Sequence, residues 1–114
     1  MSSPDAIRLR HMREAAALTL EMAAGRTRVD LDENIMLRMA LTRCLEILGE
    51  AASKVTPATR AQLPAIPFAK IVSMRNRLIH AYFDVDLNIV WTTVTDDLPA
   101  LIPALDAALA DVDP

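Results

Sequence analysis

Glycine and aromatic residues are scarce in this chain of 114 residues. Only two glycines occur, Gly25 and Gly49, and aromatic residues make up 4% of the sequence. Because turns of β-hairpins use glycine and strands are rich in aromatic residues, this scarcity weakens any sheet interpretation. Alanine, leucine, methionine, glutamate and arginine are plentiful instead, and this composition favours helices.

Several kinds of chemical site are also missing. The sequence has no glycine-rich phosphate loop, no cysteine and histidine set with the spacing of a metal site, and no H-E-x-x-H pair. We therefore expect no metal and no bound cofactor. The single cysteine, Cys44, cannot form an internal disulfide and lies in an apolar run. A small buried thiol fits a reducing compartment, so we expect a cytoplasmic protein.

Long uncharged segments and excess positive charge are absent too. No apolar stretch has the roughly 18 or more uncharged residues of a membrane span, and residues 1–16 lack the apolar core of a signal peptide. We expect no contact with a membrane. The net charge is −3, whereas a protein that binds polyanions over its whole surface is normally basic. Contact with nucleic acid would need a local basic patch, or a second subunit that adds its patch to the first.

Apolar residues recur with helical periodicity along most of the chain. The first helix is predicted to run over residues 4–24, with Ser3 as its N-cap. The second helix is predicted to be capped by Asp30 or Asp32 and to reach about Lys54. A hydrophobic fraction of 53% in a chain of this length indicates one domain over residues 1–114, with a single core.

The apolar face of the second helix is unusually wide. Such a width predicts contact on two sides, with the chain's own bundle and with a second subunit. Gly49 lies inside this helix, where it costs about 1 kcal/mol relative to alanine. We therefore expect another backbone to pack closely against Gly49.

The remaining apolar residues predict two further main helices. One opens at Pro67, and the other begins near Leu87 and either bends or restarts at Pro99. The predicted fold is all-α: an antiparallel up-and-down bundle of four main helices with short additional segments.

Polar groups concentrate at the end of the third helix, in the stretch RNRLIHAY over residues 75–82. At about 100° per residue, Asn76 and His80 lie within about 40° of each other, but Arg75 and His80 are about 140° apart. These two side chains converge only if the helix ends near His80 or a ligand lies along the groove. A plain helix end would also carry a histidine in its last turn and solvated arginines, so the motif by itself leaves both interpretations open.

The residue types fit RNA cleavage without a metal. Histidine takes up and returns a proton near neutral pH, and arginine presents a fixed fork of donors to a phosphate. His80 would help to deprotonate the 2′-hydroxyl or protonate the leaving oxygen, while Arg75 would stabilise charge on the phosphorane. One such histidine per chain is few for two proton transfers, and a symmetric dimer would supply a second.

The chain resembles a known family at these residues. Arg75-x4-His80-x-Tyr82 is similar to the R-x4-H-x-Y motif of HEPN-domain proteins, specifically the HepT-like toxins. The resemblance extends to LEILGEAASKV at 45–55 and to nearly all of residues 66–101. The departures are small: Phe68 stands where tryptophan is common, and Ser73 where glycine is common.

The resemblance implies a specific system. HepT-like proteins are helical-bundle homodimers, and they act as ribonuclease toxins in type VII toxin–antitoxin systems. By resemblance, Arg75 and His80 are the catalytic pair at a cleft by the dimer interface, and Asn76 and Arg77 position the RNA. The partner is a minimal nucleotidyltransferase of the MNT type, the antitoxin, which transfers AMP to Tyr82. Two alternatives remain: a non-catalytic dimeric subunit of a nucleotidyltransferase complex that binds nucleotide or RNA, and a plain bundle whose motif is only a helix end.

Overall fold

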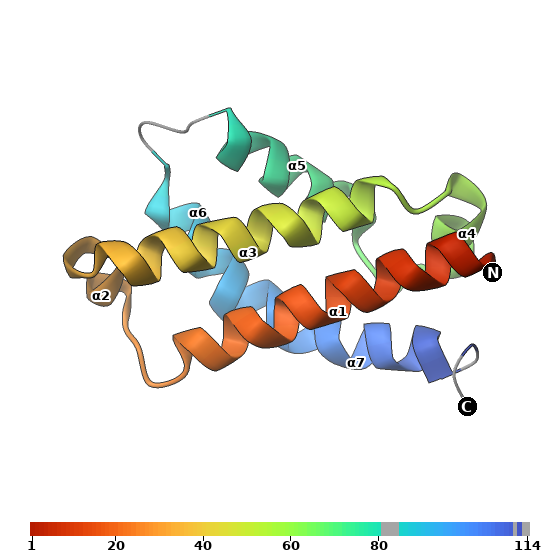
Figure 1. Cartoon of the computed structure of the whole chain (residues 1–114), viewed down its shortest axis with the longest axis horizontal. Coiled ribbons are helices and arrows are strands. Elements are labelled where there is room, and N and C mark those ends of the chain that lie inside the picture. The colour runs from red at the N-terminus through yellow and green to blue at the C-terminus, as the bar shows by residue number, and fades with distance from the viewer. Residues whose placement is uncertain (81–84, 111, 113–114) are drawn as a thin grey trace.

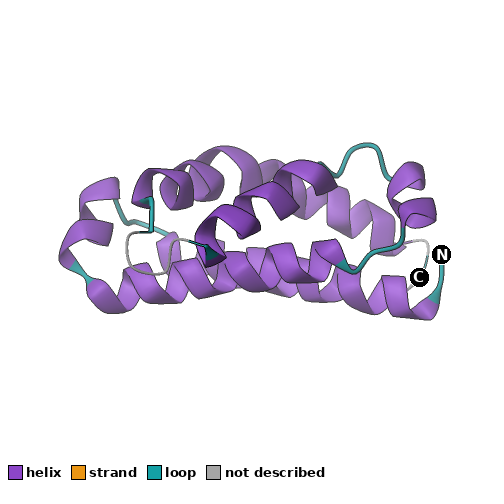
Figure 2. Ribbon diagram, turned by 90° about the horizontal axis from the view of Figure 1, so that it is seen from above, coloured by secondary structure: helices purple, strands orange, loops and turns teal. Residues whose placement is uncertain are grey.

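The structure is a computed structural model that describes residues 1–80, 85–110 and 112. Every regular element in these residues is a helix (Figure 2). In chain order they are α1 (Ser3–Ala23), α2 (Arg28–Glu33), α3 (Ile35–Ser53), α4 (Pro57–Gln62), α5 (Phe68–Ile79), α6 (Leu87–Thr92), the π-helical turn η1 (Thr93–Asp97) and α7 (Leu98–Ala110). None of the described helices combines the length and the apolar character needed to cross a bilayer.

The main helices alternate in direction, as the sequence predicts. Figure 1 shows α1 and α3 side by side and antiparallel, with α5 on the far side of α3 and α7 beside α1. Their inward faces meet in one apolar core, which includes Leu9, Met12, Leu45, Leu48 and Leu105. The predicted all-α bundle is therefore confirmed, and α3 is the helix that joins α5 to the rest of the molecule.

Two predicted helix boundaries are wrong. The first helix begins one residue earlier than predicted, because Ser2 rather than Ser3 is the N-cap and its Oγ accepts a hydrogen bond from the amide of Asp5 at 3.2 Å. The predicted second helix is two helices. Asn34 leaves the helical conformation, ends α2, and caps α3 by accepting a hydrogen bond from the amide of Leu37 at 3.0 Å. Asp30 is therefore not the cap of the long helix; it completes the capping box of α2 with Thr27.

The predicted bend near Pro99 takes the form of a π-helical turn. α6, η1 and α7 follow one another without a break, and the amide of Leu98 donates to the carbonyl of Thr93, five residues earlier. Proline has no N–H to donate, and its ring clashes with the carbonyl four residues before it. A wider turn just before Pro99 relieves this clash and keeps the helix continuous.

A buried carboxylate ties the start of α1 to the start of α4. Asp5 is 2% exposed and accepts hydrogen bonds from the amide of Thr56 at 3.0 Å, from the Thr56 hydroxyl at 2.6 Å and from the Thr59 hydroxyl. The two hydroxyl bonds lower the pKa of Asp5 from 3.8 to about 2, although burial acts in the opposite direction. The pKa is depressed in the folded state, so this stabilisation is present above pH 4 and is lost as the pH falls through about 2.

Candidate active site

The polar stretch predicted as a site lies on α5 and at its C-terminal end. Phe68, Ile71, Met74 and Leu78 are buried, and α5 packs chiefly on α3. The helix ends at Ile79, and His80 is its C-cap; the His80 amide donates to the carbonyl of Asn76 at 3.2 Å. The helix therefore ends near His80, which is one of the conditions that the helical angles set for Arg75 and His80 to converge, but the helix end does not bring the two side chains together in one chain.

Arg75 packs closely against α3 because Gly49 has no side chain at the point of contact. A Cβ atom placed on Gly49 would lie 2.7 Å from Cγ of Arg75 and 3.2 Å from the carbonyl oxygen of Ile71. The expected close approach of another backbone to Gly49 is confirmed, and the approaching helix is α5. The Nε atom of Arg75 is buried and has no hydrogen-bond partner among the described residues. Buried donors are normally paired, and because this one is inaccessible to solvent, a ligand reaches it only if the Arg75 side chain moves.

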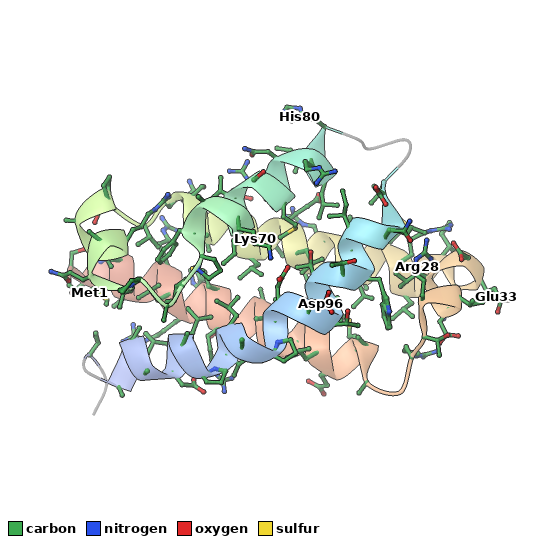
Figure 3. All side chains as sticks on the ribbon, turned by 180° about the vertical axis from the view of Figure 1, so that it is seen from behind. Met1, Arg28, Glu33, Lys70, His80 and Asp96 are labelled. Carbon is green, nitrogen blue, oxygen red and sulfur yellow. The ribbon has the colours of Figure 1, made fainter. Side chains whose placement is uncertain are left out.

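The other polar residues of the stretch face outward. Asn76, Arg77 and His80 are exposed, and Figure 3 shows His80 at the outer tip of α5, directed away from the bundle. No hydrogen bond joins the side chains of Arg75 and His80. The helix thus presents Arg75 toward α3 and His80 toward solvent, as the angles predict. Tyr82, the proposed modification site, lies outside the described residues.

A groove lies between α3 and the end of α5, with a volume of about 680 Å³. We call it the α3–α5 groove. Its walls carry Arg38 and Arg43 from α3, opposite Leu78 and Ile79 of α5. Neither arginine belongs to the RNRLIHAY stretch, and neither was predicted to be part of the site. Nothing in their local pattern could have indicated it, because only the packing of α3 on α5 brings them to the end of the RNRLIHAY stretch.

Next to this groove, α3 exposes large apolar side chains. Met36 is 79% exposed, Met39 is 64% exposed and Ile35 is 58% exposed. Ile35 and Met39 also line the α3–α5 groove, together with Ile79 from α5. We call these four residues, Ile35, Met36 and Met39 of α3 and Ile79 of α5, the α3 apolar face. It is the outward part of the wide stripe from which the sequence predicts contact on two sides of this helix.

Known proteins resemble this chain over most of its length. The family model described as "Ribonuclease HepT-like" matches residues 12–108. "Putative RNase MJ1216" of Methanocaldococcus jannaschii is 36% identical over 80 residues, which are 70% of this chain and 66% of that relative. "Probable ribonuclease HepT" of Thermococcus cleftensis is 42% identical over 64 residues, 56% of this chain and 58% of the relative.

Another relative is covered more completely. "Putative RNase TTE0752" of Caldanaerobacter subterraneus subsp. tengcongensis is 32% identical over 93 residues, which are 82% of this chain and 83% of the relative. No solved structure matches. The family model includes α5 with Arg75 and His80 and nearly all of the bundle that supports them. The chain belongs to the HepT-like ribonuclease family.

Proposed function

We propose that this protein is a metal-independent endoribonuclease, the toxin of a type VII toxin–antitoxin system. One observation carries the proposal: Gly49 holds Arg75 close to α3, and α5 ends one turn later with His80 open to solvent. Membership of the HepT-like family supports the same activity. The test is cleavage of single-stranded or transfer RNA by the purified protein in EDTA, and its absence would refute the activity.

The chemistry divides between the two side chains. His80 exchanges a proton with the 2′-hydroxyl or the leaving oxygen, because an exposed imidazole is accessible to a bound strand. Arg75 stabilises the charge that develops on the phosphate, because its guanidinium is permanently charged and presents a planar fork of N–H donors. The exposed side chains of Asn76 and Arg77 hold the strand along α5.

A second copy of the chain completes the site. The α3 apolar face is large, exposed and adjacent to the end of α5, so a two-fold contact through it would bring both copies of His80 to one cleft. Arg38 and Arg43 of each copy would then border this cleft. In the described lining of the groove these two arginines outnumber the carboxylate of Glu46, so the cleft is locally positive although the net charge of each chain is −3.

Charged substitutions on the α3 apolar face should prevent dimer formation. The double variant Met36→Glu/Met39→Glu is expected to be a folded monomer, because a carboxylate buried without a partner costs several kcal/mol. RNA cleavage should fall at least tenfold with the loss of the dimer. Light scattering coupled to size exclusion measures the mass. The control is Leu18→Glu, an equally apolar residue of α1 that is 47% exposed, which should leave mass and cleavage unchanged. A dimeric Met36→Glu/Met39→Glu variant would refute the interface.

The partner antitoxin is a nucleotidyltransferase of the MNT type that transfers AMP to Tyr82. A bulky anionic group two residues from His80 would fill the cleft and repel the substrate phosphate. Intact mass after incubation with such an enzyme and ATP is expected to rise by the mass of one or more AMP units. The Tyr82→Phe variant should show no increase and should stay toxic in the presence of the partner. The same increase in mass in the Tyr82→Phe variant would show that another residue carries the modification. Partner binding without RNA cleavage would instead indicate a non-catalytic regulatory subunit.

A further inference from the structure

A second pocket lies on the other side of α5 from the α3–α5 groove. We call it the α5–η1 pocket. Its volume is about 370 Å³, within the range of roughly 300–1,000 Å³ typical of small-ligand sites. Ile71 and Met74 of α5 and Leu98 and Leu101 of α7 form its apolar floor. Arg77 lines this pocket, whereas Ile79 lines the groove, and the two residues lie about 160° apart on the helix.

Two cationic side chains, Lys70 and Arg77, lie at the rim of the pocket, and they differ in their contacts. Lys70 of α5 reaches across to η1, where its Nζ lies 2.8 Å from Oδ1 of Asp97, and Figure 3 shows Lys70 between α5 and the segment that carries Asp96. This ion pair raises the pKa of Lys70 through the hydrogen bond and the charge of Asp97. Arg77 is exposed and makes no hydrogen bond or ion pair with the described residues. Within the described part of the chain, Arg77 is therefore the rim cation that a ligand can engage without breaking another contact.

The rim also carries uncharged hydrogen-bonding groups. Thr92, at the end of α6, is exposed and lines the pocket with its neighbour Asn88. The Oδ1 atom of Asn88 accepts a hydrogen bond from Nε of Arg28 at 2.9 Å. That bond occupies the acceptor end of the amide and leaves its NH₂ group to donate to a ligand. The pocket therefore combines an aliphatic floor with an amide and a hydroxyl at its edge.

The charge balance of the pocket selects among anionic ligands. Among the lining residues, Lys70 and Arg77 supply two positive charges and Asp97 one negative charge, and Asp96 beside the rim also acts on Lys70. Lys70 is thus balanced by these carboxylates, and Arg77 is left to neutralise the single negative charge of a phosphodiester. A nucleoside triphosphate carries several and would meet the carboxylate of Asp97. The pocket thus suits a nucleotide that is part of a strand better than a free nucleotide.

We propose that the α5–η1 pocket binds one base of the RNA strand, with an adjoining phosphodiester on Arg77, and so sets the nucleotide preference of cleavage. This inference rests on the proposed function. Arg77 lies three residues before His80, which is about 4.5 Å along a helix axis, so one strand could contact both. Proteins that read single-stranded RNA take unstacked bases into such pockets and bond to their edges. The Asn88 amide and the Thr92 hydroxyl would distinguish the bases here.

The test fills the pocket without touching Arg75 or His80. The Thr92→Phe variant places a ring in the pocket, and Thr95→Phe is the matched control, because Thr95 is exposed, lies one turn along and does not line the pocket. The first measurement is the nuclear magnetic resonance titration of each protein with 2′-O-methyl dinucleoside monophosphates of the four bases. These probes cannot be cleaved, because the 2′-hydroxyl is blocked. The second is sequencing of RNA ends produced by each protein from total transfer RNA.

The wild-type protein is expected to bind the dinucleoside monophosphate of one base more tightly than those of the other three. The chemical shifts of Asn88 and Thr92 should change as it binds. Binding should weaken at least tenfold in Thr92→Phe and stay unchanged in Thr95→Phe, and the cut sites should lose their preference at one flanking nucleotide. Equal binding by Thr92→Phe and the wild-type protein, or no shift at pocket residues at millimolar probe, would overturn the inference.

The two measurements separate this inference from the proposed function. Base-selective binding that Thr92→Phe abolishes, in a protein that cuts no RNA, would uphold the pocket and refute the ribonuclease. Cleavage whose nucleotide preference is the same in the wild-type protein and Thr92→Phe would uphold the ribonuclease and refute the pocket. Thermal unfolding of each variant verifies that Thr92→Phe is folded; if it is not, Asn88→Ala, which removes the amide and adds no volume, replaces it with the same expected loss of preference.

Discussion

Replacing His80 by alanine is expected to reduce RNA cleavage by about 10²- to 10⁴-fold, the usual contribution of a general acid or base. Growth inhibition by the expressed protein should disappear with it. The fold should be unaffected, because His80 is exposed and the hydrogen bond that it makes at the helix end comes from its backbone amide, which alanine retains. Initial rates of RNA cleavage in EDTA and circular dichroism of the same samples measure the two properties.

The chain provides a matched control for this substitution. Its other histidine, His11, is also exposed but lies on α1, in a pocket of about 230 Å³ between α1 and α3. His11→Ala removes the same side chain from the same kind of surface, and cleavage should remain at the wild-type rate. Normal toxicity of His80→Ala would refute a catalytic role for His80. Equal loss in both variants would show that the assay responds to something other than the proposed site.

The local part of the candidate site could be predicted from the sequence. Helical angles alone place Asn76 and His80 together and Arg75 apart, and the structure has Asn76 and His80 exposed and Arg75 against α3. The angles could not say which helix Arg75 faces. The position of Arg38 and Arg43 near the end of α5 could not be predicted either, because it depends on how α5 crosses α3. Tertiary packing leaves no periodic signal in either helix.

Most of the fold could also be predicted from the sequence, and the errors in that prediction concern single helix boundaries. Apolar periodicity predicted the four main helices, since it reflects a core that every helix must face. The short connections between them predicted their alternating direction. Apolar periodicity could not reveal the break at Asn34, because the helical spacing of apolar residues continues from α2 into α3. Asn34 ends the first of these helices and caps the second. The α3 apolar face was part of the same periodic apolar pattern. Sequence alone cannot distinguish apolar residues that pack on the core from those that stay exposed.

The substitution Gly49→Ala is expected to destabilise the protein by about 1–2 kcal/mol and to lower RNA cleavage. Alanine gains about 1 kcal/mol over glycine in a helix, but its Cβ would clash with Cβ and Cγ of Arg75. Overpacking of this kind costs about 1–3 kcal/mol or more. The Cβ of Arg75 is fixed to the backbone, so no change of rotamer removes the clash and α5 must shift on α3. Urea unfolding measures the loss of stability.

Gly25→Ala is the control for glycine itself. Gly25 has a φ of +74°, and no atom lies within 4 Å of an added Cβ, so its cost is conformational and is about 1–2 kcal/mol. The two variants should therefore lose comparable stability, yet only Gly49→Ala should lose cleavage, because only Gly49 contacts the helix that carries Arg75 and His80. Equal cleavage by the two variants would show that the position of α5 on α3 does not matter for the reaction.

Second-site variants identify the atom responsible for the clash. Arg75→Gly removes the Cβ that Gly49→Ala would meet, whereas Arg75→Ala keeps it. In a double-mutant cycle, Arg75→Gly should recover part of the stability that Gly49→Ala loses, by about 1 kcal/mol or more of coupling, and Arg75→Ala should recover less. Neither double variant should cleave RNA, because both lack the guanidinium. Recovery of stability without recovery of cleavage would separate the two roles that we propose for Arg75: its Cβ determines how closely α5 packs on α3, and its guanidinium binds the phosphate.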